Sequence, residues 1–160
     1  MSMYRMISNA SSLMTLADLG VIDTALRKVR SMTITDVTLK EIMDNRGRGA
    51  QLKNIQKIGS LVKKNQIKVV TLQAKERRPM NRIRNRTGLH PSELSAILLY
   101  RRRCFDIILV RDKDEAELYE LNGARCIDIT TFGNIRERLS GMPRAVWHTK
   151  LEKGHRKKSR

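Results

Sequence analysis

The sequence FDIILVRDKD at residues 105–114 decides the fold class, because an apolar run of strand length ends there in two acids. Its centre, residues 107–110, has the pattern of a strand that is buried on both faces of a parallel sheet. Asp112 and Asp114 follow at the carboxyl end of this strand. Ligands of open α/β sheets bind at that edge, so both acids are candidates for a metal or catalytic site. Asp is also a common helix N-cap, and either residue could instead begin the next helix.

Strands and helices are expected to alternate along the rest of the chain. Short apolar runs predict further strands at 4–8, 32–35, 67–72 and 125–129. Apolar residues at helical spacing predict helices at 13–19, 22–29, 37–43, 52–62, 91–98, 115–121 and 132–139. Such alternation favours a three-layer α/β/α fold with a central parallel sheet. The first and fourth strands commonly flank the switch point of such a sheet, so Asn9 and Ser11 should lie beside Asp112 and Asp114.

Composition indicates one domain with a polyanionic partner. The chain has 160 residues and a formal net charge of +17. Nucleic acid is a stronger candidate than a membrane surface, because the basic residues are not gathered on one face of an amphipathic helix. We expect a domain over 1–140 with a basic loop at 75–88, followed by a basic tail at 141–160. Candidates for phosphate contacts are Arg77, Arg78, Arg82, Arg84, Arg86, Arg101, Arg102, Arg103, Lys150, Lys153, Arg156, Lys157 and Lys158.

Neither a membrane span nor a secretory signal is visible in the sequence, which predicts a cytoplasmic protein. Cys104 and Cys126 lack the spacing of a zinc site and have no nearby His. They are expected to be small buried apolar side chains and not a disulfide. His90 lies in a predicted loop, and the sequence gives no support for a general acid or base built on His.

Four segments in register resemble the PIN-domain family. They are ISNASSLMTLADLG at 7–20, VTLKEIMD at 37–44, GLHPSELSAILL at 88–99 and IILVRDKDEAELYELNGARCID at 107–128. The resemblance implies a small α/β/α domain whose acidic pocket holds Mg²⁺ or Mn²⁺ and cleaves RNA by hydrolysis. Many members of that family are toxins that pair with an antitoxin.

The resemblance also implies which residues form the site. Glu41, Glu93 and Asp112 fall on acids of the family pattern, and Asp114 is a nearby substitute or supplement. Carboxylate oxygens are the ligands that Mg²⁺ prefers. Asn9 stands where the family has an Asp, which keeps an oxygen and removes a charge. Ser11, two residues later, is interpreted as a cap or an orienting hydroxyl.

Three functions follow from these observations. The leading one is a metal-dependent endoribonuclease that uses Mg²⁺ or Mn²⁺ at Glu41, Glu93, Asp112 and Asp114, with RNA as substrate, a possible antitoxin partner and a possible homodimer. The alternative is a catalytically weak or inactive PIN-like module that binds RNA or a ribosome, which Asn9 favours. A protein that binds DNA or a toxin through charge alone is the third. Metal-dependent cleavage separates the first function from the other two.

Overall fold

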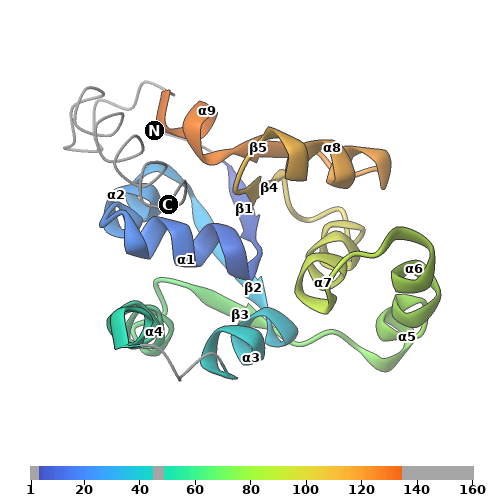
Figure 1. Cartoon of the computed structure of the whole chain (residues 1–160), viewed down its shortest axis with the longest axis horizontal. Helices are drawn as coiled ribbons and strands as arrows, with labels where there is room; N and C mark the ends of the chain where they lie inside the picture. Colours follow the sequence, from blue (N-terminus) through green and yellow to red (C-terminus); the bar gives the residue numbers. More distant parts are fainter. Residues whose placement is uncertain (1–3, 45–48, 135–160) are drawn as a thin grey trace.

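A computed structural model of the chain describes residues 4–44 and 49–134 (Figure 1). Its five strands form one parallel sheet in the order β3-β2-β1-β4-β5. The strands are β1 (Arg5–Ser8), β2 (Ser31–Thr35), β3 (Lys68–Val70), β4 (Ile107–Val110) and β5 (Cys126–Asp128). The helices are α1 (Ala10–Asp18), α2 (Ile22–Lys28), α3 (Asp36–Asp44), α4 (Gly49–Lys63), α5 (Ala74–Arg77), α6 (Met80–Thr87), α7 (Pro91–Tyr100), α8 (Lys113–Leu121) and α9 (Ile129–Asn134). The predicted three-layer α/β/α fold is confirmed.

Helices cover both faces of the sheet, and each face has its own apolar core. Met6 and Leu109 point to the face covered by α1, α2 and α4. Ile7 and Ile108 point to the opposite face, which α6, α7 and α8 cover. Figure 1 shows α1 and α4 on one side of the strands and α6 and α7 on the other. All four residues of β4 are buried, as its apolar run predicted.

The central strand β1 pairs with β2 on one side and with β4 on the other. Its register with β4 places Ser8 opposite Leu109, so both strands end at the same edge. At the opposite edge, the Asp106 carboxylate accepts hydrogen bonds from Arg5 N at 2.7 Å and from Arg5 Nε at 3.3 Å. The prediction that the first and fourth strands lie next to each other in the sheet is therefore confirmed.

The basic segment 75–88 is helical, so the predicted basic loop is wrong. Gln73 and Glu76 form a capping box that begins α5, and Gly88 ends α6 with a positive φ of 70°. Ile83 is the buried residue of α6 and packs in the core with α7. One buried residue in eight leaves no helical periodicity in the sequence, which is why the pattern suggested a loop.

Two other expectations need correction. Cys104 is exposed and Cys126 is half-buried, so neither is a fully buried apolar side chain, although both are free thiols as predicted. The last described helix begins at Ile129 and not at 132, because the Asp128 carboxylate accepts hydrogen bonds from the N–H and the hydroxyl of Thr131. Residues 135–139 of that predicted helix, and the tail, lie outside the described residues.

Within the described part of the chain, no helix is long and apolar enough to cross a membrane.

An ion pair attaches α5 to the turn after α7 and makes stability depend on pH. Arg102 Nε donates to Glu76 Oε2 at 2.7 Å, and Gln73 N donates to Glu76 Oε1 at 2.9 Å. The hydrogen bond from Arg102 is the main reason that the pKa of Glu76 falls to about 2. A carboxyl group whose pKa is lower in the folded state stabilises the fold above its unfolded pKa, and this contribution is lost as the pH falls toward 2.

Glu76→Gln should therefore lower the free energy of unfolding at pH 7 by about 0.5–1 kcal/mol, the usual range for a partly exposed ion pair. The difference between variant and wild type should shrink as the pH falls from 4.5 to 2. Urea unfolding followed by circular dichroism at several pH values measures it. A difference that stays constant over this range would contradict the role assigned to the Glu76 charge.

Candidate functional site

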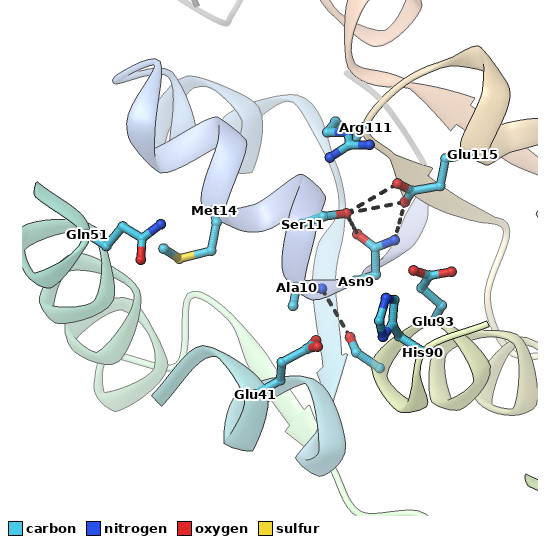
Figure 2. Close-up of a pocket in the computed structure, with 11 residues that line it drawn as sticks. Asn9, Ala10, Ser11, Met14, Glu41, Gln51, His90, Glu93, Arg111 and Glu115 are labelled. Carbon is cyan, nitrogen blue, oxygen red and sulfur yellow. Dashed lines mark hydrogen bonds between the residues drawn. The ribbon is translucent and has the colours of Figure 1, made fainter. Parts of the chain in front are cut away.

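A cavity of about 400 Å³ opens at the carboxyl edge of β1 and β4 (Figure 2). Residues from both sides of the switch point and from the flanking helices line it. They are Asn9, Ala10, Ser11, Met14, Glu41, Gln51, His90, Ser92, Glu93, Arg111 and Glu115. The place is the one that the strand order predicts for a ligand site.

Asn9 is held in the wall of the cavity by hydrogen bonds at both ends of its side-chain amide. It follows β1, caps α1 and is only 1 % exposed. Its side-chain oxygen Oδ1 accepts from Ser12 N at 2.9 Å and from Ser12 Oγ at 2.6 Å, and Ser11 Oγ lies 3.1 Å from it. A backbone N–H can only donate, so this bond fixes which end of the amide is oxygen. The Asn9 NH₂ group consequently faces the other way.

The Asn9 amide nitrogen donates to two groups of α8. One is the Glu115 carboxylate and the other is Tyr119 Oη, at 2.7 Å. Burial raises the pKa of Tyr119, so the phenol stays neutral and carries no charge into the site. Glu115 is 9 % exposed and also accepts from Ser11 Oγ at 3.3 Å. Asn9 therefore joins the first strand to α8 through hydrogen bonds made by its own side chain.

Glu115 occupies the place that the sequence assigned to Asp112 and Asp114, and that expectation is corrected. Asp112 is the N-cap of α8: its Oδ1 accepts from Glu115 N at 2.9 Å, and its Oδ2 accepts from Arg111 Nε at 3.1 Å. Asp114 is exposed on the first turn of α8, and neither residue lines the cavity. The cap turns Glu115 toward the sheet. The spacing Asp-x-x-Glu at 112–115 matches a capping-box pattern and marks the start of α8, but it does not indicate that Glu115 faces Asn9.

Glu41 and Glu93 both line the cavity, as the sequence suggested they would. Burial is the main cause that raises the pKa of Glu93, and the nearby Glu115 carboxylate raises it further. Electrostatic interactions with His90 and Arg111 lower the pKa of Glu93 and so act in the opposite direction. Figure 2 shows Glu93 and His90 on the Glu115 side of Asn9, whereas Glu41 enters from α3 on the other side of Ala10. His90 and Arg111 were not among the predicted site residues.

Buried hydroxyl groups support the cavity from below. Ser92 Oγ accepts from Ala10 N at 3.2 Å and lies 2.9 Å from Thr38 Oγ1. Thr35 Oγ1 lies 2.6 Å from Ser95 Oγ, which connects β2 to α7. These bonds tie the starts of α1, α3 and α7 together, so the side chains above them are held on fixed backbone.

A family model described as PIN domain matches residues 5–131. This chain belongs to the PIN-domain family. Among solved structures, the fold is similar to that of PAE2754 from Pyrobaculum aerophilum, with 19 % identity and a TM-score of 0.52 over 82 % of this chain and 94 % of that one. No curated protein matches the chain. Family membership supports a nuclease-type or RNA-related function, since PIN domains are generally nucleases.

PIN domains typically use divalent metal ions, but the cavity of this PIN domain does not fit one. Nowhere in residues 4–44 and 49–134 do three His, Cys, Asp or Glu side chains converge closely enough to hold a metal ion. The Asn9 NH₂ group, a hydrogen-bond donor, is directed at Glu115. The Arg111 guanidinium, a permanent cation, lines the same cavity. A donor and a cation stand where a metal site needs oxygen ligands and negative charge.

The predicted phosphate-binding residues of this PIN domain divide into three groups. Arg77 and Arg102 are exposed but form ion pairs with Asp36 and Glu76. The other six within the described residues are also exposed: Arg78, Arg82, Arg84, Arg86, Arg101 and Arg103. The tail residues Lys150, Lys153, Arg156, Lys157 and Lys158 lie outside the described part of the chain.

Asn9→Asp should lower the free energy of unfolding in EDTA by about 1–3 kcal/mol, because a buried donor becomes a carboxylate that faces Glu115. Asn9→Asp combined with Glu115→Gln should recover most of this loss. The carboxylate and the amide then exchange places, and the amide introduced at position 115 donates to the carboxylate introduced at position 9. Urea unfolding of wild type, both single variants and the double variant gives the coupling energy. Equal stability of wild type and Asn9→Asp would contradict the contact between Asn9 and Glu115.

Proposed function

We propose that this PIN-domain protein binds RNA and cleaves it weakly or not at all. The observation that carries the proposal is α6, a helix without an acidic residue that exposes Arg82, Arg84 and Arg86. These arginines have no carboxylate on their own helix to balance them. A polyanion supplies the missing charge, and family membership makes RNA the polyanion to test first.

The position of α6 supports a link between this charge and the cavity. Ile83 anchors α6 against α7, and the chain runs from Gly88 through Leu89 directly to His90 and Glu93 in the cavity wall. The C-terminal end of α6 is therefore joined to the cavity wall by a connection of only two residues, Gly88 and Leu89. Arg101 and Arg103 at the far end of α7 extend the exposed basic surface. Backbone contacts of this kind give affinity without sequence preference.

The weak-cleavage part of the proposal is supported by the chemistry of the cavity. Asn9 and Arg111 remove negative charge where hydrolysis by a divalent ion needs it. The second candidate function is a metal-dependent endoribonuclease that uses Mg²⁺ or Mn²⁺. Such an enzyme could act as the toxin of a toxin–antitoxin pair. Three carboxylates in one cavity, those of Glu41, Glu93 and Glu115, favour it.

Reversing the charge of α6 should weaken RNA binding. The variant Arg82→Glu/Arg84→Glu/Arg86→Glu should bind a single-stranded RNA at least about tenfold more weakly, and the slope of log K against log salt should fall by up to about 2. The control is Lys53→Glu/Lys63→Glu/Lys64→Glu, which changes the net charge equally with exposed residues of, or next to, α4 on the other face of the sheet. Fluorescence anisotropy over a salt series measures both. Equal losses in the two variants would show that only net charge matters.

Cleavage is tested on the same RNA with Mn²⁺ and with Mg²⁺. We expect no product beyond that formed by Glu93→Gln and Glu115→Gln variants purified in parallel. Product that appears with wild type and disappears in both variants would establish the endoribonuclease instead. RNA binding would be unaffected by that result, so the two halves of the proposal are tested separately.

A further inference from the structure

We propose that Asn9 and Arg111 replace a divalent cation in this cavity: the chain neutralises its own carboxylates, and the site is complete without metal. The inference goes beyond RNA binding and does not rest on it. It concerns how buried carboxylates are kept together, which in any protein requires positive charge or hydrogen-bond donors nearby.

The Asn9 side chain has no acceptor left for a cation. Its Oδ1 accepts hydrogen bonds from Ser12 N and Ser12 Oγ, which occupy both lone pairs of the amide oxygen. Its Nδ2 is used by Glu115 and Tyr119. All hydrogen-bonding capacity of this buried side chain is thus satisfied inside the protein.

Glu115 is partnered in the same way. Its Oε1 accepts from Asn9 Nδ2, and its two oxygens lie 3.4 Å and 3.3 Å from Ser11 Oγ. Only 9 % of the residue is exposed, so most of Glu115 is shielded from solvent. A cation that recruited Glu115 would have to break the bonds to Asn9 and Ser11 first.

Arg111 supplies the permanent positive charge. It directly follows β4 and lines the cavity together with Glu93 and Glu115. Its Nε donates to Asp112 Oδ2 at 3.1 Å, and both of these side chains are nearly half exposed, at 46 % and 47 %. A guanidinium does not lose its proton in proteins, so it lowers the repulsion among the carboxylates at every pH and repels a second cation.

Binding of Mn²⁺ to the full-length protein, without RNA, tests the inference. Electron paramagnetic resonance of free Mn²⁺ should show no stoichiometric binding to wild type at concentrations up to about 0.1 mM, in the range of weak metal sites. The variant Asn9→Asp/Arg111→Asp should bind Mn²⁺ at least about tenfold more tightly, because two oxygen ligands replace a donor and a cation. Adding Glu93→Gln to that variant should abolish the gain.

The matched control is Asn65→Asp/Arg125→Asp, which makes the same two types of substitution at exposed positions outside the cavity and outside α6. It should bind no more Mn²⁺ than wild type, which excludes a general effect of net charge. Thermal melts add a second readout. Wild type should melt at the same temperature in EDTA and in Mn²⁺, whereas Asn9→Asp/Arg111→Asp should be stabilised by the metal through mass action.

Stoichiometric Mn²⁺ binding by wild type that Glu93→Gln removes would overturn the inference, whatever the RNA result. A folded Asn9→Asp/Arg111→Asp variant that gains no Mn²⁺ binding would also overturn it, since other residues would then exclude the metal. If this variant does not fold, Arg111→Gln in the wild-type background takes its place, and unchanged Mn²⁺ binding together with unchanged stability would overturn the role of Arg111. Loss of RNA binding in the α6 variant bears on none of these outcomes.

Discussion

The pairing of β1 with β4 is the constraint on which the site depends. Residues 101 positions apart in the sequence meet at one end of this pair, where Asp106 binds Arg5, and the register then carries Ser8 to Leu109 at the other end. Ser12 Oγ also lies 3.0 Å from Leu109 O, which brings the start of α1 against the same strand. Asn9 and α8 are neighbours only because these two strands are. Any change that opens the pair separates the two halves of the cavity.

At the carboxyl ends of β1 and β4, the chemistry of the cavity follows from the orientation of the Asn9 side-chain amide. Ser12 N–H binds the Asn9 oxygen, so the nitrogen has to face Glu115. An Asp in this place would accept the same bond from Ser12 and present a negative charge to α8. In our proposal, this oxygen-to-nitrogen difference and the Arg111 cation together remove the need of these acids for an external cation. The fold remains that of a PIN domain, while the charge in its cavity differs from that of a PIN domain with Asp at this position.

The sequence predicted those features that leave a pattern over several residues. It did not predict which residues within a single helix turn face the cavity. Apolar runs and their alternation with helical segments predicted the sheet and its switch point, because burial on two faces leaves a clear pattern. Asn9 was recognised as a departure, and Glu41 and Glu93 were placed near it. Glu115 was missed because the rotation of α8 about its cap at Asp112 is set by tertiary packing. Arg111 was missed for the related reason that nothing in the strand pattern says toward which side a residue just after β4 will point.

The α5–α6 helices were missed because their apolar content is too small to show a period. A capping box at Gln73 and Glu76, and a single buried Ile83, hold a segment whose composition is that of a loop. Such a segment depends on its neighbours for stability, and here the neighbours are charges: Asp36 and Glu76 bind Arg77 and Arg102. Two of the arginines that appeared free for phosphate in the sequence are therefore structural.

The two cysteines give this chain a natural attachment point for a chemical label. Cys104 is exposed and directly follows the basic residues 101–103, whereas burial raises the pKa of Cys126 to about 12. Thiolates, and not thiols, react with maleimides and similar reagents, so near neutral pH Cys126 is almost entirely unreactive. A fluorophore or spin label therefore attaches selectively at Cys104 without any substitution. It stands beside the arginines at the end of α7, where the arrival of a polyanion changes its surroundings directly.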